Sequence, residues 1–154
     1  MRYVKNEHDA EELTNESFIR AFGKIETFSS GDSGDRFEKS FRAWLARITV
    51  NISIDFLRAQ KQFVALDDVG EGDIEQQHVE VSGELHVKDI MKLLAQLPEI
   101  QRAIFNLYEV EGYSHEEVSM MLAIPESTSR TYLTRAKKKL RKLYLASTNI
   151  TAGF

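Results

Sequence analysis

Apolar residues recur every three or four positions along most of the chain, which predicts helices rather than strands. The first such run covers residues 10–28, behind a more polar turn at its start. A loop follows at residues 29–35, which contain two glycines and no apolar side chain. The apolar positions of this first predicted helix are Phe18, Ala21, Phe22, Ile25 and Phe28.

The strongest helical pattern covers residues 41–62 and has two apolar sides, so this helix is expected to pack against partners on both. A narrow polar stripe runs between the two sides, and taken alone it is the solvated edge of a buried helix. One apolar side consists of Phe41, Leu45, Ile48, Ile52, Phe56 and Ala59, and the other of Ala43, Val50, Ile54 and Leu57. The stripe consists of Arg47, Asn51, Arg58 and Lys61.

Four shorter helical segments are predicted in the second half of the chain. The first covers residues 87–97, and the next covers residues 100–112 with Gly112 as its C-terminal stop. A third begins at Ser114, where Glu117 three positions later completes a capping box. Pro125 ends that helix because proline disfavours helix at the residue before it, and a fourth helix starts in the same turn, capped by Ser127 or Thr128.

The last predicted helix has one apolar side and one basic side. Its apolar side consists of Ser129, Leu133, Ala136, Leu140 and Leu143, and its basic side of Thr131, Thr134, Arg135, Lys138 and Lys142, with Arg130 and Arg141 at the margin. A helix of this kind fits the major groove of DNA, where long cations reach phosphates and guanine edges. The alternative is a solvated amphipathic helix, but the capped helix and proline turn just upstream favour DNA binding.

The distribution of charge agrees with that interpretation, although the net charge of the chain is −4. Residues 1–63 carry ten basic and ten acidic side chains, residues 64–98 two and eight, and residues 99–154 eight and six. The positive charge is therefore concentrated near the C-terminal end, and local field decides DNA contact. We predict an all-α protein with a helical domain at residues 1–63, an acidic flexible linker at 64–86, a helix-turn-helix domain at 87–146 and a tail at 147–154 that is frayed.

Other functional classes have little support in the sequence. There is no cysteine, no phosphate-cradling glycine loop and no catalytic constellation, so neither an enzyme nor a bound cofactor is predicted. The four histidines, His8, His78, His86 and His115, are not spaced as metal ligands. No apolar run reaches membrane-spanning length and no secretory signal is present, so no membrane insertion and a cytoplasmic location are expected.

Three ordered blocks resemble a bacterial RNA polymerase sigma factor of the extracytoplasmic-function (ECF) group. These blocks are DAEELTNESFIRAF at residues 9–22, FRAWLARITVNISIDFLR at residues 41–58, and LPEIQRAIFNLYEVEGYSHEEVSMMLAIPESTSRTYLTRAKKKLRK at residues 97–142. The resemblance covers nearly all of the chain. It implies a non-catalytic subunit that binds core RNA polymerase, recognises and melts promoter DNA, and directs transcription initiation.

The resemblance also implies roles for individual residues. The first block would bind the clamp coiled coil of core RNA polymerase, and the second would hold the melted minus-ten element, with one base flipped into a pocket. The third would read the minus-thirty-five element, and an anti-sigma factor would mask one of these surfaces. The polymerase-binding residues are Asp9, Glu12, Leu13, Asn15, Glu16 and Phe18. The minus-ten residues are Phe28 and Asn51 at the pocket, with Arg47, Arg58 and Lys61 on the phosphates; the minus-thirty-five residues are Arg130, Thr131, Thr134, Arg135 and Lys138.

The chain departs from the family pattern at several points. Asn15 stands where the family prefers Gln, Ser127 where it usually has Gly, Ser129 where it often has Val, and Tyr132 where it often has a basic residue. The loop at residues 29–40 is longer than usual, and the family usually has a further helical stretch ahead of the residues that match 1–6, so part of the first domain's core is expected to be missing. Two rival hypotheses are a helix-turn-helix regulator that binds duplex operator DNA without polymerase, and a purely protein-binding helical module.

Overall fold

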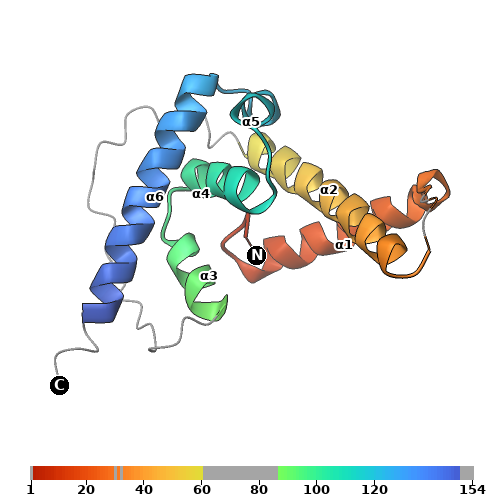
Figure 1. The fold of residues 1–154 in the computed structure, drawn as a ribbon, viewed down its shortest axis with the longest axis horizontal. Coiled ribbons are helices and arrows are strands. Elements are labelled where there is room, and N and C mark those ends of the chain that lie inside the picture. Colours follow the sequence, from red (N-terminus) through yellow and green to blue (C-terminus); the bar gives the residue numbers. More distant parts are fainter. Residues whose placement is uncertain (1, 30, 32, 61–86, 150–154) are drawn as a thin grey trace. The chain divides into compact units, whose positions relative to one another are not determined.

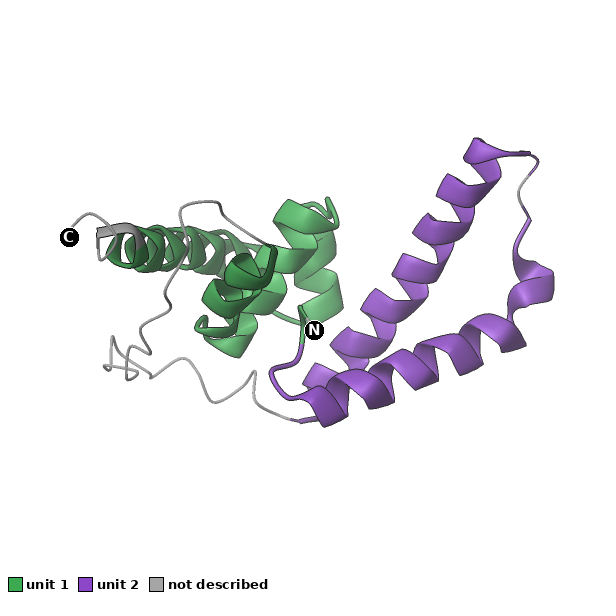
Figure 2. Ribbon diagram, turned by 90° about the horizontal axis from the view of Figure 1, so that it is seen from below, with its two compact units in different colours: residues 1–3, 61–154 green, residues 4–60 purple. Residues whose placement is uncertain are grey.

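Every regular element among the described residues is a helix, as the sequence pattern predicts (Figure 1). The computed structural model describes residues 2–29, 31, 33–60 and 87–149. Two compact units are present: an N-terminal unit, Val4–Gln60, and a C-terminal unit, Met1–Tyr3 with Lys61–Phe154 (Figure 2). The all-α prediction is therefore confirmed. The predicted linker at residues 64–86 lies outside the described residues and stays a prediction.

The N-terminal unit is a helical hairpin of α1 (Glu7–Gly23) and α2 (Asp35–Ala59), with a short 3₁₀ turn, η1 (Ile25–Thr27), after α1. Asn6 caps α1, because its side-chain oxygen accepts a hydrogen bond from the Asp9 N–H at 2.7 Å. The buried side of α1 consists of Leu13, Ser17 and Ala21. This spacing of four positions places small side chains where α1 meets α2, so the two backbones can approach closely.

The predicted apolar side of α1 is therefore only partly the side that is buried. Of its five members only Ala21 is buried, whereas Phe18, Phe22 and Ile25 are exposed and Phe28 is half-buried. Helical spacing identifies positions that share a side, but it does not say which side a neighbouring helix covers.

α2 begins at Asp35, before the predicted start at Phe41, and ends at Ala59. Gly34 precedes it with φ +63°, a backbone conformation that favours glycine, so the chain can turn sharply into the helix there. The earlier start shortens the predicted loop and makes residues 35–40 helical. The buried residues of α2 lie in its second half and are Val50, Ile52, Ser53, Ile54 and Leu57.

Five helical elements lie in the described part of the C-terminal unit. They are α3 (Val87–Ala95), α4 (Glu99–Phe105), η3 (Asn106–Val110, a π-helical turn that continues α4), α5 (His115–Leu122) and α6 (Glu126–Asn149). α6 packs against α3, α4 and α5. The core of this unit includes five apolar side chains with no exposed surface: Leu97, Ile104, Leu107, Val118 and Ala136. α6 continues to Asn149, three residues into the predicted tail, and residues 150–154 lie outside the described residues.

The first residues of the chain belong to the C-terminal unit, which the sequence did not indicate. The buried Arg102 side chain donates to the Tyr3 carbonyl at 3.1 Å, and the Asn106 amide donates to the Arg2 carbonyl at 2.7 Å. Arg2 also forms an ion pair with Glu111 at 3.0 Å. Burial lowers the pKa of Arg102 and raises the pKa of the Tyr3 hydroxyl.

α5 starts and stops where the sequence predicts, and the cap of α6 differs from the prediction. The capping box at Ser114 is confirmed: Glu117 N–H donates to the Ser114 hydroxyl at 3.2 Å, and Ser114 N–H donates to the Glu117 carboxylate at 2.8 Å. α5 ends at Leu122, and its C-cap residue Ala123 has a left-handed φ of 53°. α6 starts at Glu126, immediately after Pro125, so Ser127 lies inside its first turn rather than at the cap.

A polar contact joins the first residue of α5 to the first turn of α6. The His115 Nδ1 atom and the hydroxyl of Ser129 lie 2.9 Å apart, and Ser129 is fully buried. The Tyr108 ring stacks on His115, with 4.3 Å between ring centroids. Desolvation, with the charges of Arg130 and Lys137, lowers the pKa of His115, whereas Glu126 opposes that shift. The Ser129 hydroxyl therefore has a hydrogen-bonding partner, which allows a serine to stand on the buried apolar side of α6.

We predict that Ala123→Gly stabilises the C-terminal unit by about 1 kcal/mol. A left-handed conformation costs a residue with a Cβ atom about 1–2 kcal/mol, and glycine avoids this cost. Glycine also loses more backbone entropy on folding, which offsets part of the stabilisation. The expected rise in the melting temperature of this unit is about 4 °C, measured by calorimetry. Ala43→Gly, inside α2, serves as the control and should destabilise the N-terminal unit by about 1 kcal/mol. No change for Ala123→Gly would show that the turn is unstrained.

We predict that protonation of His115 destabilises the C-terminal unit. A lowered pKa in the folded state means that the unfolded chain binds the proton more tightly, so stability is complete above the ordinary value of 6.5 and is lost as the pH falls from there through the lowered folded value. Melting temperatures at pH 7.5 and 5.5 should fall further for the wild type than for His115→Gln, which does not titrate. Equal losses would contradict this role for His115.

Candidate nucleic-acid and polymerase interfaces

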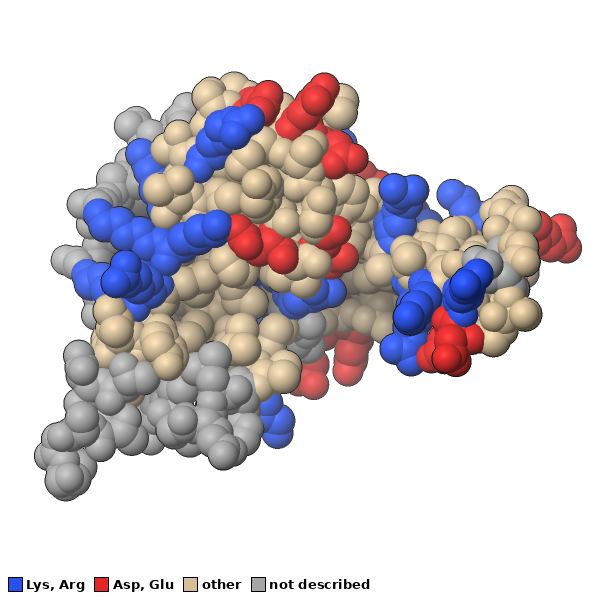
Figure 3. Space-filling model, viewed as in Figure 1, with Lys and Arg blue, Asp and Glu red and all other residues tan. Residues whose placement is uncertain are grey.

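The basic side of α6 faces solvent. Lys and Arg side chains gather over α6 in Figure 3. Ser129, Leu133 and Ala136 are buried against the other helices of the unit, as the sequence predicts. The opposite side is exposed at all five predicted minus-thirty-five positions: Arg130, Thr131, Thr134, Arg135 and Lys138. The buried side of α6 is narrow because two of its residues are small. Most of the surface of the helix is therefore available to the major groove of DNA.

Several of these exposed side chains already have partners within the helix. Arg130 pairs with Glu126 one turn earlier, and the Arg135 guanidinium lies 5.5 Å from the centre of the Tyr132 ring. The hydroxyl of Thr131 donates to the Ser127 carbonyl at 2.9 Å, and the hydroxyl of Thr134 donates to the Arg130 carbonyl at 3.0 Å. These bonds leave the threonine oxygens free to accept hydrogen bonds and their methyl groups free to touch thymine.

The lysines of α6 differ in their surroundings. Lys137 pairs with Glu109 of η3, which ties the middle of α6 to the preceding helix. Burial, with the charge of Lys142, lowers the pKa of Lys139. Lys138 is exposed and, among the described residues, forms no ion pair. Of these three consecutive lysines, Lys138 is therefore the one that is available to bind a phosphate.

The predicted minus-ten residues share one side of α2. Arg47, Asn51 and Arg58 are all exposed, and successive spacings of four and seven residues keep them on one helix face. Lys61, the fourth predicted member of the stripe, lies outside the described residues. Neither Arg47 nor Arg58 is engaged in an ion pair with another described residue.

Phe28 is half-buried in a group of aromatic rings at the start of α2. Its ring centroid lies 5.4 Å from that of Phe41, 5.2 Å from that of Trp44 and 5.6 Å from that of Phe37. We call these four side chains the aromatic cluster. The rings hold the segment after η1 against α2, so Phe28 both closes the hairpin and lies beside the arginine-bearing face of α2.

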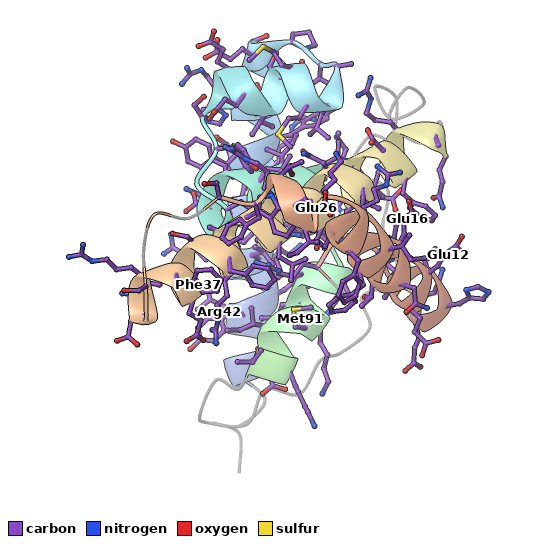
Figure 4. All side chains as sticks on the ribbon, turned by 90° about the vertical axis from the view of Figure 1, so that its right-hand side faces the viewer. Glu12, Glu16, Glu26, Phe37, Arg42 and Met91 are labelled. Carbon is purple, nitrogen blue, oxygen red and sulfur yellow. The ribbon has the colours of Figure 1, made fainter. Side chains whose placement is uncertain are left out.

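The predicted polymerase-binding residues divide between the surface and the interior of the N-terminal unit. Glu12, Asn15 and Phe18 are exposed, and Phe18 stacks on Phe22 with 6.4 Å between ring centroids. Glu12 and Glu16 lie on the same side of α1 in Figure 4. Leu13, by contrast, is 7% exposed and packs in the core, so its part in any interface is to hold α1 in place.

Two of the predicted polymerase-binding residues have partners on α1 or at its N-cap. Glu16 is paired with Arg20 at 2.6 Å, and the Asn6 amide donates to the Asp9 carboxylate at 2.6 Å. The carboxylate atoms of Asp9 and Glu12 and a ring nitrogen of His8 lie within 4.8 Å of one another. These are surface groups at the start of a helix, where acidic side chains offset the helix dipole.

Sequence reasoning missed two functional candidates because it placed them in a loop. Arg36 and Phe37 lie in the first turn of α2, and Phe37 belongs to the aromatic cluster. A signal was present: Phe37, Phe41 and Trp44 are spaced by four and three residues, which is helical spacing. Across the described residues, no helix combines the length and the apolar character that a membrane span requires.

Comparison with known proteins identifies two matching domains in the expected order. Residues 1–63 match "Sigma-70 region 2" and residues 88–140 match "Sigma-70, region 4". The ECF RNA polymerase sigma factor SigE of Mycolicibacterium smegmatis is 33% identical over 151 residues, covering 94% of this chain and 55% of SigE. SigW of Bacillus subtilis, also an ECF RNA polymerase sigma factor, is 30% identical and is matched over 78% of its length, with 92% of this chain covered.

The fold has a counterpart of known structure. A co-crystal structure of the sigma factor RpoE with the anti-sigma factor NepR from Bartonella quintana matches with a TM-score of 0.54 and 23% identity, covering 93% of this chain and 85% of that one. At this identity the likeness concerns the fold alone. The chain spans about half the length of SigE and more than three quarters of SigW. With both sigma-70 regions present in order, the chain belongs to the ECF RNA polymerase sigma factors, the family of initiation factors that direct transcription.

Proposed function

We propose that this sigma factor binds core RNA polymerase through α1, holds the melted minus-ten element on α2, and reads the minus-thirty-five element with α6. It acts in the cytoplasm as a non-catalytic subunit. The observation that supports this assignment best is the exposed Arg, Lys and Thr side of α6, on a helix whose opposite side is buried at Ser129, Leu133 and Ala136. The matches to both sigma-70 regions supply the context.

Recognition by α6 would use two kinds of contact. Arg130 and Arg135 supply planar guanidinium groups that suit the two acceptors of guanine in the major groove, and Lys138 supplies a point charge for phosphate. Before Arg130 contacts a base, its bond to Glu126 must open or be shared. An ion pair on the surface contributes about 1 kcal/mol or less, so a bidentate contact with guanine outweighs it.

Binding of the melted strand would use the exposed side of α2. Unstacking one base costs a few kcal/mol, and stacking on an aromatic side chain returns roughly 1–3 kcal/mol per base. Phe28 has three aromatic neighbours that hold its ring in place, and Asn51 offers both donor and acceptor groups to a base edge. Arg47 and Arg58, on the same face, would neutralise phosphates beside the flipped base.

The rival assignment, a regulator that binds duplex operator DNA without polymerase, is not favoured. It requires residues 1–63 to form a sensor or dimerisation domain, and those residues match sigma-70 region 2 instead. An anti-sigma partner also belongs to this proposal, as the family resemblance implies. The RpoE structure from Bartonella quintana contains such a partner, NepR, which is a property of that protein.

We predict that Arg135→Ala reduces initiation at promoters with a matching minus-thirty-five element by about 5- to 150-fold, which corresponds to 1–3 kcal/mol for one base contact. Lys88→Ala, which removes an exposed cation from α3 in the same unit, should leave initiation unchanged. The measurement is abortive transcript formation by the reconstituted holoenzyme on promoters with intact and scrambled minus-thirty-five elements. If Arg135→Ala retains full discrimination between the two promoters, α6 does not read the element.

We predict that Glu12→Lys weakens binding to core RNA polymerase at least about tenfold, because it reverses one of the charges proposed to contact the clamp. Glu11→Lys is the matched control: it is exposed on the same turn and costs α1 the same interaction with the helix dipole. Competition with the wild-type chain for core polymerase measures both. Equal affinity of the two variants would remove α1 from the interface.

A further inference from the structure

The first turn of α2 presents an aromatic ring that is only partly used in packing. The Phe37 ring lies parallel to that of Phe41, with 6.3 Å between centroids and 6° between planes, and edge-on to that of Phe28 at 5.6 Å. Phe28, Phe41 and Trp44 are half-buried, whereas Phe37 is 45% exposed. The cluster therefore fixes the orientation of the Phe37 ring and leaves part of that ring open to solvent.

The same turn extends the arginine stripe of α2. At about 100° per residue, Arg36 falls within about 60° of Arg47, Asn51 and Arg58 around the helix axis, and all four are exposed. Over the described residues, none of the three arginines forms an ion pair. Arg42 is different: it lies on another side of α2 and pairs with Glu38 at 2.5 Å (Figure 4 labels Phe37 and Arg42).

An exposed aromatic ring beside unpaired cations is the combination that binds single-stranded nucleic acid. The ring stacks on the face of an unpaired base, and the cations follow the backbone. A base pair inside a duplex has both faces covered by its neighbours, so such a ring has no use for double-stranded DNA. A protein partner would be expected to bury the ring without needing three unpaired arginines along one helix face.

We propose that Phe37 stacks on a second unpaired base of the promoter strand, and that Arg36 binds a phosphate next to it. This inference rests on the function proposed above and deepens it. The basic stripe of the single-strand site on α2 then runs from Arg36 to Arg58 instead of beginning at Arg47, and the helical start of α2 supplies its additional subsite. The site takes single-stranded DNA, and Phe37 acts through contact with one base at a defined position.

The test uses the full chain assembled with core RNA polymerase and a fluorescent single-stranded oligonucleotide that carries the non-template minus-ten sequence. One base at a time is replaced by an abasic residue, and the dissociation constant is measured for the wild type and for Phe37→Leu, which keeps an apolar side chain but cannot stack. For the intact oligonucleotide we expect Phe37→Leu to bind at least about fivefold more weakly. At one position, removal of the base should weaken the wild type by a similar factor and leave Phe37→Leu unaffected.

Arg36→Ala and Arg42→Ala form the matched pair for the phosphate contact, because both remove an arginine from the first turns of α2. Only Arg36→Ala should weaken binding, and only it should reduce the salt dependence of the dissociation constant, by about one phosphate contact. Affinity for core polymerase and the melting temperature are measured for every variant, and Phe37→Leu is expected to change neither appreciably.

The possible outcomes separate the inference from the function on which it rests. Equal weakening of Phe37→Leu on all abasic oligonucleotides indicates a role in packing only and overturns the inference, as does unchanged binding. In both of those cases the wild type still binds core polymerase and single-stranded DNA, so the proposed function stands. A wild type that binds neither would overturn the proposed function and the inference together.

Discussion

The orientation of α6 depends on a narrow strip of close packing. Ser129, Leu133 and Ala136 are the residues of the predicted apolar side of α6 that are buried, and two of them are small. Small residues allow neighbouring helices to approach, so a short strip of contact is enough to hold the helix. The remainder of α6 is then free to be polar, and the Arg, Lys and Thr residues occupy it. A wider apolar seam would have consumed positions that the basic side needs.

The burial of Ser129 on this strip explains why His115 contributes to the stability of the C-terminal unit. A serine at a fully buried seam position leaves a hydroxyl that requires a partner, and His115 supplies it from α5. The contact therefore joins the two helices of the helix-turn-helix through a polar bond where the family often has an apolar residue. Tyr108, stacked on the histidine ring, extends that connection to η3. The relation of α5 to α6 is set by chemistry that is sensitive to protonation.

The N-terminal unit divides its residues differently. α1 buries Leu13, Ser17 and Ala21 against α2, so its larger apolar residues remain at the surface together with its carboxylates. Exposed aromatic and other large apolar side chains gathered on one helix are typical of a protein-binding surface. On α2 the aromatic cluster occupies the first half and the buried aliphatic residues the second. One helix can thus hold the fold at one end and present a nucleic-acid surface along its length.

The sequence alone was sufficient for the helices, the capping box at Ser114 and the basic side of α6, because each depends on residue spacing within one segment. The resemblance to the family depended instead on three blocks in a fixed order along the chain. It did not determine which side of α1 would be covered, where α2 begins, or that Arg2 and Tyr3 join the C-terminal unit through Arg102 and Asn106. Those features depend on contacts between residues far apart in the chain. Helical periodicity shows which residues lie together on one side of a helix, but burial depends on the partner that covers that side, and only the tertiary structure supplies the partner.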